Sequence, residues 1–506
     1  MNIKHISVVS TYFIAMAAPL LLAFYLKPSA NEGFIAQIGM LMGLSGIMMV
    51  FFQFIIASRI KWLDRLFAYN NLIAFHRRMG VWALVFIVVH FLMLTLSEKS
   101  ADMLLGFNEP WYINLGKITF LLLSVQILVS IGHKKISINY ERWRTFHDLL
   151  AISILILMFV HSFYAGDDLE LFPLQVLWFV LPPVGIVFFI WQRFFLFTFA
   201  PKYKVLNVGK KANDTYSIQF VPINGSEPYS HNPGQFHFIK FSDCKNLKPE
   251  EHPFTISSSP SQKLHLTSTV KASGDFTSQI HQLQEGDMVK IVGPFGKMSY
   301  VEKSHSGPIV FIAGGIGITP FASMLQYMAD TGHQHEVTLF YFNTTESDIS
   351  FRAELNHISE NTPLKLKVIH ILSRQDNWEG EKGRFDTKLL EKYCPHTLMN
   401  NDYYVCGPPL MAQSVIRDLR QLQVPLTKIH SEMFGLAASG APATHHKKQA
   451  QLVSQLIVAA LIALVILFAG IRSGWKLFAD DSLKNNQSAV TSFSLKQGTG
   501  FWKSAM

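Results

Sequence analysis

Four histidines in the first third of the sequence frame two apolar stretches at one identical spacing. The stretch HRRMGVWALVFIVVH runs from His76 to His90, and HDLLAISILILMFVH runs from His147 to His161, so that 14 residues separate the members of each pair. On an α-helix, 14 residues rise about 21 Å and complete almost four turns. Each pair therefore lies on one helical face, with one imidazole near each end of the apolar run.

Imidazole pairs at two matched levels are suited to bind haem. A neutral imidazole nitrogen is a common axial ligand of haem iron, and two of them fill both axial positions, which favours electron transfer over direct binding of oxygen. If the two helices run in the same direction, His76 and His147 share one level, and His90 and His161 share the other. The spacing therefore predicts two stacked haems of the b type, with these four histidines as iron ligands.

Two other interpretations of the histidines stay open. Single histidines can lie at a membrane surface or form hydrogen bonds between helices, and several of them can line a path for metal ions. Two pairs at one spacing favour haem over the first interpretation. The near absence of acidic and cysteine partners within the apolar runs argues against the second.

The haem interpretation also gives expectations for neighbouring residues. The midpoints of the two runs, Ala83 and Ile154, should face the gap between the haems. Arg77, Arg78 and Arg144 lie where the propionates of the inner haem would be, although they could equally be ordinary positive anchors at the membrane surface.

Apolar segments of membrane-spanning length must position these histidines. The chain of 506 residues is 49% hydrophobic and 16% charged, whereas an average soluble domain carries about 25% charge. Crossing roughly 30 Å of hydrocarbon takes about 20 residues. Six segments before residue 200 are long enough: 6–26, 34–57, 72–96, 113–132, 146–164 and 171–199. We therefore expect an integral membrane protein in a lipid bilayer, with an all-α bundle of six helices in residues 1–200, whose first segment is retained rather than cleaved as a signal peptide.

The distribution of lysine and arginine predicts the orientation of this bundle. The loops after the second, fourth and sixth segments are basic, whereas the alternate loops are acidic or nearly neutral. Because positive loops stay inside, we expect the N-terminus and the region after residue 200 to be cytoplasmic, in a bacterial inner or plasma membrane. The net charge of +9 is mostly this bias, and we expect no nucleic-acid partner. The three cysteines form no CxxC pair, which suits a reducing compartment.

The region after residue 200 has ordinary globular composition and divides into two parts. Residues 201–303 read as short strands broken by turns, which predicts a small antiparallel β-barrel. Residues 304–436 alternate strands and helices, which predicts a doubly wound α/β nucleotide domain. We expect residues 437–450 to be a linker, 451–472 an additional transmembrane helix, and 473–506 a C-terminal tail.

Two stretches of the predicted barrel bear on a flavin. HPFTISS begins at His252 and sets the aromatic Phe254 beside the hydroxyl of Thr255. SGDFTSQI follows a strand and opens a short helix, so that Gly274 and Thr277 could offer donors to a phosphate. Each stretch is weak evidence when taken singly.

Two further stretches bear on a dinucleotide. PIVFIAGGIGITPFASML reads as strand, glycine turn and helix, in which Gly314, Gly315 and Gly317 let the backbone approach a pyrophosphate and Pro320 suits a first helical turn. Its spacing departs from GxGxxG. VCGPPLM places Cys406 at the carboxyl end of a strand, where ligands of such sheets bind. A tight loop at the glycines and a buried small residue at Cys406 are the alternatives.

The order of HPFT, GPFG, AGGIGITP and CGPP resembles the ferredoxin-reductase module of membrane NADPH oxidases and ferric reductases, and the histidine spacing resembles their transmembrane domain. The resemblance covers about residues 1–436 and is closest to prokaryotic-like members. It implies FAD and NADPH as cofactors, with NADH as an alternative. In this family the chain usually stops just after a terminal aromatic residue. Phe434 resembles that residue, and in this sequence 72 residues follow it.

The resemblance implies roles for individual residues. Phe254 and Thr255 would contact the flavin ring, Cys406 would lie near the nicotinamide, and Phe434 would cover the flavin. Ser373 and Arg374 resemble the pair that meets the 2′-phosphate of NADPH. The flavin set is His252, Pro253, Phe254, Thr255, Ser257, Gly274, Phe276, Thr277 and Phe434. The nicotinamide-cofactor set is Gly314, Gly315, Gly317, Thr319, Pro320, Ser373, Arg374, Cys406, Gly407 and Pro408.

We therefore expect a flavocytochrome b of the NAD(P)H oxidase or ferric reductase type. Electrons would pass from cytosolic NADPH through FAD and the two haems to an outside acceptor, either oxygen, which gives superoxide, or chelated ferric iron. One alternative is a relay to a dedicated partner protein outside the membrane. Another is a histidine-lined transport channel with a regulatory nucleotide domain.

Overall fold

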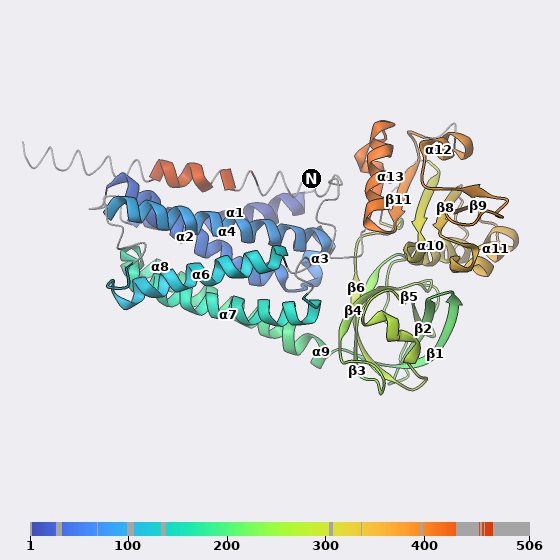
Figure 1. Ribbon diagram of the computed structural model, residues 1–506, viewed down its shortest axis with the longest axis horizontal. Helices are drawn as coiled ribbons and strands as arrows, with labels where there is room; N and C mark the ends of the chain where they lie inside the picture. Colours follow the sequence, from blue (N-terminus) through green and yellow to red (C-terminus); the bar gives the residue numbers. More distant parts are fainter. Residues whose placement is uncertain are drawn as a thin grey trace, which may run out of the picture. The chain divides into compact units, whose positions relative to one another are not determined.

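The computed structural model describes residues 3–26, 33–67, 69–98, 106–132, 138–302, 307–334, 336–394, 398–431, 455, 458–459 and 461–468 (Figure 1). The chain forms two compact units. The membrane unit comprises residues 1–58, 73–190 and 451–506, and the reductase unit comprises residues 59–72 and 191–450.

The membrane unit contains the six predicted spans. The helices concerned are α1 (Ile3–Leu26), α2 (Phe34–Ala57), α4 (Tyr69–Glu98), α6 (Trp111–Gly132), α7 (Tyr140–Ala165) and α8 (Phe172–Ile190). Among the described residues, these six helices are long and apolar enough to cross a membrane, the last together with the short turns up to Thr198. The prediction of six apolar helices is confirmed, because continuous runs of apolar residues without helix-breaking turns leave few other structures available.

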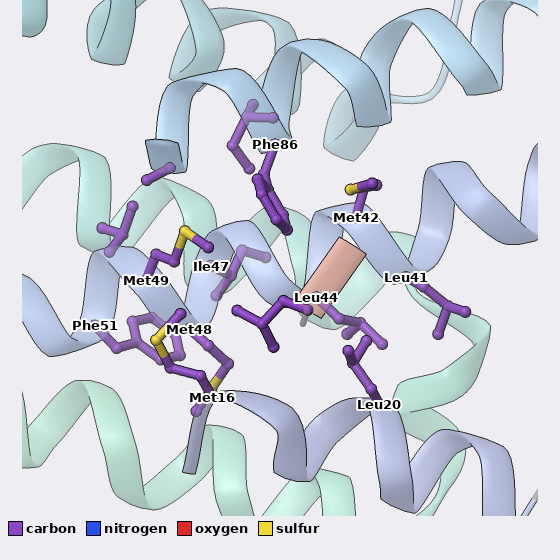
Figure 2. Packing of buried hydrophobic residues seen from close by; sticks show 14 of the residues in the cluster. Met16, Leu20, Leu41, Met42, Leu44, Ile47, Met48, Met49, Phe51 and Phe86 are labelled. Carbon is purple, nitrogen blue, oxygen red and sulfur yellow. The ribbon is translucent and has the colours of Figure 1, made fainter. Parts of the chain in front are cut away.

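Helix α2 forms the centre of this unit. Its apolar stretch is 72% buried, against 28% or less for the other five helices. Figure 2 shows its residues Leu41–Phe51 between Met16 and Leu20 of α1 and Phe86 of α4. The predicted midpoints of the histidine runs, Ala83 and Ile154, are both buried in the same cluster. The two histidine helices therefore turn the faces between their histidines toward the interior.

Part of the predicted seventh span lies in the described residues. Residues 461–468 are helical, and Val458, Leu461, Val465 and Phe468 are buried in the cluster around α2. The ring of Phe468 stacks on Phe24 of α1 with centroids 4.4 Å apart. The structure does not establish the full predicted extent of this helix, and the linker 437–450 and the tail 473–506 lie outside the described residues.

The first half of the reductase unit is the predicted antiparallel barrel. Its strands lie in the order β4-β3-β6-β1-β2-β5, and a bridge between Ile256 and Ser268 joins the two edge strands. A short 3-10 helix, η3 (Thr277–Gln282), follows β5. The strands are β1 (Lys202–Ala212), β2 (Thr215–Pro222), β3 (Phe236–Asp243), β4 (Glu251–Thr255), β5 (Leu266–Lys271) and β6 (Met288–Phe295).

The second half is the predicted doubly wound α/β domain. Its parallel strands lie in the order β10-β9-β8-β7-β11-β12, so that the chain reverses direction across the sheet between β7 and β11. The strands are β7 (Ile309–Gly314), β8 (Val337–Asn343), β9 (Leu366–Leu372), β10 (Glu381–Lys382), β11 (Asp402–Cys406) and β12 (Ile429–Ser431). The helices are α10 (Thr319–Asp330), α11 (Arg352–Asn361), α12 (Thr387–Tyr393) and α13 (Pro409–Gln421). Two separate apolar clusters show that both faces of the sheet are covered.

The reductase unit also includes residues 59–72, which connect α2 to α4 and contain the short helix α3 (Lys61–Phe67). Arg59 forms a 2.8 Å ion pair with Glu251 at the start of β4, and its guanidinium lies 3.8 Å from the ring centre of Phe238. Lys61 Nζ donates to the carbonyl of Gly293 at 2.8 Å. The buried carboxylate of Asp64 accepts from the backbone N–H of Gly296 at 3.1 Å. A connection between two membrane helices is thus packed into the barrel.

The Arg59–Glu251 pair gives a stability prediction. Both side chains are nearly buried, at 6% and 12% exposure, so that Arg59→Ala leaves a buried carboxylate without its partner. We expect a loss of about 3–5 kcal/mol in the stability of the reductase unit, measured by denaturant unfolding of the full-length protein with flavin fluorescence as the signal. The double variant Arg59→Ala/Glu251→Ala should lose less.

Arg417 provides the matched control. Its ion pair with Asp418 leaves the arginine side chain 61% exposed, so that Arg417→Ala should cost no more than about 1 kcal/mol. Equal losses for Arg59→Ala and Arg417→Ala would contradict a structural role for the buried pair.

Candidate functional site

The inner histidine pair is brought together by α4 and α7. The ring centroids of His76 and His147 lie 6.2 Å apart. Two imidazoles that bind one metal through nitrogens about 2 Å away place their ring centres roughly 6 Å apart. The separation of the two ring centres therefore fits two axial ligands of one iron atom.

Hydrogen bonds to main-chain carbonyls orient the outer histidines. His90 Nδ1 donates to the carbonyl of Gly39 on α2, and His161 Nδ1 donates to the carbonyl of Tyr112 on α6, each at 2.8 Å. A carbonyl only accepts, so that each ring carries its hydrogen on Nδ1 and keeps the lone pair of Nε2 for a metal. His147 Nδ1 has a similar partner, the hydroxyl of Ser130 at 3.2 Å.

Two glycines allow the outer rings to reach these positions. A Cβ atom at Gly43 would lie 2.7 Å from His90 Nδ1, and one at Gly116 would lie 2.5 Å from His161 Cε1. Any larger residue would therefore displace the imidazole. Neither glycine was predicted from the sequence. The Gly39-xxx-Gly43 spacing was a signal for close helix contact on α2, but it does not say which side chain fills the space.

The predicted flavin residues lie on β4 and on the turn before η3. His252 stacks on Phe276 with ring centroids 4.1 Å apart, and its Nε2 lies 3.2 Å from a carboxylate oxygen of Glu250. Burial lowers the pKa of His252, while Glu250 acts in the opposite direction. Since Thr255 is buried and Pro253 is exposed, β4 presents a mixed surface to any ligand.

The other predicted flavin residues also have defined partners. The hydroxyl of Thr277 accepts from the backbone N–H of Gly274 at 2.9 Å, so that it holds the turn together. Ser257 Oγ lies 3.0 Å from Thr269 Oγ1 in the barrel interior. The predicted contacts of these residues with FAD stay predictions. Phe434 lies outside the described residues.

The two predicted dinucleotide turns meet at the ends of β7 and β11, where the sheet reverses its order. A Cβ atom at Gly317 would lie 2.3 Å from the carbonyl oxygen of Cys406, and one at Gly407 would lie 3.0 Å from Gly314 Cα. Gly315 has a φ of +53°, which favours glycine. The structure therefore brings these residues together, at the position where doubly wound sheets bind ligands.

The remaining predicted residues complete this edge of the sheet. Thr319 and Pro320 open α10, and the hydroxyl of Thr319 donates to the carbonyl of Ile316 at 3.0 Å. Pro408 lies against Gly314, because a Cβ there would be 2.9 Å from its Cδ. Ser373 and Arg374 follow β9 and are exposed to solvent.

Three family models match consecutive parts of the chain. Residues 42–158 match the ferric reductase like transmembrane component, residues 202–314 match an FAD-binding domain, and residues 311–417 match the oxidoreductase NAD-binding domain. This combination matches the ferric reductase and NADPH oxidase family, as the sequence motifs predicted. The protein is thus an NAD(P)H-dependent membrane oxidoreductase with FAD- and NAD(P)-binding domains.

Curated relatives match part of the chain. The chain is 28% identical over 218 residues to sulfhydrogenase 2 subunit gamma of Pyrococcus furiosus, which covers 40% of this chain and 72% of the relative. It is 32% identical over 163 residues to NADH-cytochrome b5 reductase 1 of Candida glabrata, which covers 32% of this chain and 57% of the relative. The chain thus spans about half to three-quarters of these curated relatives.

Solved structures are similar over about half of the chain. The FAD/NAD-binding domain of a nitric oxide dioxygenase from Vibrio cholerae is 22% identical with a TM-score of 0.42, over 47% of this chain and 99% of that domain. The cytochrome b5 reductase domain of Ulva prolifera nitrate reductase is 21% identical with a TM-score of 0.41, over 47% of this chain and 98% of that domain.

Gly116 provides a test of the outer histidine. Gly116→Val should push the His161 ring out of its position and remove one of two predicted haems, while FAD content and reduction of the flavin by NADPH remain. Gly132→Val is the matched control, because this glycine lies on the same helix and a Cβ atom added to it would meet no other atom within 4 Å. Pyridine haemochrome assays per FAD measure the outcome. Two haems in Gly116→Val would contradict the assigned role of this glycine.

Proposed function

We propose that the protein carries electrons from cytosolic NADPH across the membrane through FAD and two haems of the b type to an acceptor on the outer side. The observation that supports this most strongly is the orientation of the histidines. The ring centres of His76 and His147 lie 6.2 Å apart, and the outer rings are held with Nε2 available. Bound FAD supplies the change from two-electron hydride chemistry to one-electron haem chemistry.

Different residues of the reductase unit bind different parts of NADPH. The turn at Gly314–Gly317 lets the backbone approach the pyrophosphate, and Cys406 at the end of β11 lies beside the nicotinamide. Arg374 offers a guanidinium to the 2′-phosphate. Residues His252–Thr255 position the flavin ring, and the role expected for Phe434 concerns a residue outside the described part of the chain. Since several relatives are named NADH-cytochrome b5 reductases, NADH is the alternative donor.

The residues of the membrane unit hold the two haems. His76 and His147 ligate the inner haem, and His90 and His161 ligate the outer haem. The main-chain carbonyls of Gly39 and Tyr112 accept from Nδ1 of the two outer imidazoles and so fix their direction and tautomer. The N-terminus and the reductase unit lie on the cytoplasmic side of a bacterial inner or plasma membrane, in accord with the basic loops.

The acceptor determines the physiological reaction. We assign it as oxygen, which is reduced to superoxide, or as ferric iron in a chelate. In the alternative function, the protein would relay electrons to a dedicated partner protein on the outer side.

A comparison of acceptors tests this proposal. NADPH oxidation should be supported by oxygen, by ferric citrate or by both, when these are added outside sealed vesicles that contain the purified protein and enclose NADPH. Vesicles with the variant His161→Ala, which should lack the outer haem, should reduce neither oxygen nor ferric citrate. The flavin of this variant should still be reduced by NADPH. Negligible turnover until a partner protein is added would refute reduction of a small acceptor and favour the relay.

A further inference from the structure

The loops after β8 and β9 form one continuous surface at the carboxyl edge of the sheet. The backbone N–H of Ser373 donates to the carbonyl of Asn343 at 3.1 Å, and that of Arg374 donates to the carbonyl of Thr344 at 3.0 Å. These bonds continue the pairing of β8 with β9 beyond the ends of the strands. The backbone of Arg374 is therefore fixed next to the loop that contains Glu346, and its side chain is exposed.

Glu346 is joined to the Arg374 loop by a second set of contacts. Its backbone N–H donates to Gln375 Oε1 at 2.6 Å, and the amide of Gln375 donates back to its carboxylate at 3.4 Å. The residue next to Arg374 thus binds both the main chain and the side chain of Glu346. The carboxylate of Glu346 is thus bonded to the residue that follows Arg374 in the sequence.

A second guanidinium, that of Arg352, contacts Glu346, and its charge is balanced by this carboxylate. Arg352, the first residue of α11, forms an ion pair with the carboxylate of Glu346, and its guanidinium lies 5.9 Å from the ring centre of Trp378. Both members of the pair are accessible, at 45% and 42% side-chain exposure. The positive charge of Arg352 is therefore compensated by Glu346, whereas Arg374 lies on the neighbouring loop.

This arrangement has opposite consequences for the two nicotinamide cofactors. A 2′-phosphate carries nearly two negative charges, which a carboxylate repels and which two free guanidinium groups would attract. A ribose 2′-hydroxyl is neutral and can donate a hydrogen bond to a carboxylate. In NAD-specific sites an acidic residue accepts this hydrogen bond. Glu346 should therefore weaken the binding of NADPH directly, and weaken it further by holding Arg352. The binding of NADH should be unaffected.

We propose that Glu346 is a specificity-determining residue that limits the preference of the protein for NADPH over NADH by engaging Arg352. The inference rests on the proposed function, in which the Ser373–Arg374 loop receives the 2′-phosphate. Arg352 acts as a reserve cation for that phosphate and becomes available when its pairing with Glu346 is removed.

The variant Glu346→Gln tests the proposal, since it removes the charge and keeps the shape of the side chain. The ratio of kcat/KM for NADPH to that for NADH, measured by flavin reduction in the full-length protein, should rise about tenfold. The affinity for 2′,5′-ADP relative to 5′-AMP, measured by competition, should rise in parallel. The double variant Glu346→Gln/Arg352→Gln should lose most of this gain.

Glu354 provides the matched control. It lies on the same helix as Arg352, pairs with Lys211 and is 40% exposed, so that Glu354→Gln makes the same charge change and should leave the cofactor ratio unaltered. A ratio in Glu346→Gln that stays within about twofold of the wild type, or a gain that survives the loss of Arg352, would overturn the proposal.

Separate results identify a failure of the proposed function itself. If wild-type flavin is reduced by neither dinucleotide, the reductase assignment fails. If Arg374→Ala lowers the affinities for 2′,5′-ADP and 5′-AMP equally, the loop does not bind the 2′-phosphate. Neither result resembles the unchanged ratio that would refute the role of Glu346 alone.

Discussion

The need to hold neutral imidazoles in fixed directions inside an apolar bundle is the constraint on which the membrane unit depends. An unpaired polar nitrogen in such surroundings is costly, and a ring without a fixed partner cannot keep one nitrogen directed at a metal. The carbonyls of Gly39 and Tyr112 satisfy both requirements for His90 and His161. Gly43 and Gly116 provide the space that these bonds need, so that α2 and α6 help to position the two rings.

A second constraint acts where the chain leaves the apolar bundle. Residues 59–72 connect two membrane helices but pack with the barrel, through the buried Arg59–Glu251 pair and the fully bonded carboxylate of Asp64. Tyr69, the first residue of α4, contacts Phe238 of β3 edge-on, and the same helix contains His76. Glu251 directly precedes His252 on the strand assigned to the flavin. The connection 59–72 is therefore packed against strands β3 and β4 of the barrel.

Much of the fold was predictable from the sequence because its signals are local. Long apolar runs indicated the six spans, and short strands bounded by turns indicated the barrel. The glycine turn at Gly314–Gly317 and the strand end at Cys406 were both predicted to bind the dinucleotide, and the structure brings them together because the sheet reverses its order between them.

The features that could not be predicted depend on contacts between distant residues. Arg59 and Lys61 lie in a loop that the sequence shows only to be basic, and it gives no sign that both are bonded to the barrel. The contact of Gly116 with His161 depends on which helices are neighbours, and the pairing of Glu346 with Arg352 depends on the fold of a single loop. Predicted roles at Phe434 and beyond residue 468 lie outside the described residues and stay predictions.

Anaerobic reduction of the purified protein tests the central claim most directly. NADPH is added in the absence of oxygen and of any other acceptor, and the absorption of flavin and haem is followed together. We expect that two haems per FAD become reduced after the flavin, and that both spectra are those of b-type haem with two axial histidines. Flavin reduction with haem that stays oxidised, or a protein that holds fewer than two haems per FAD, would contradict the proposed electron path.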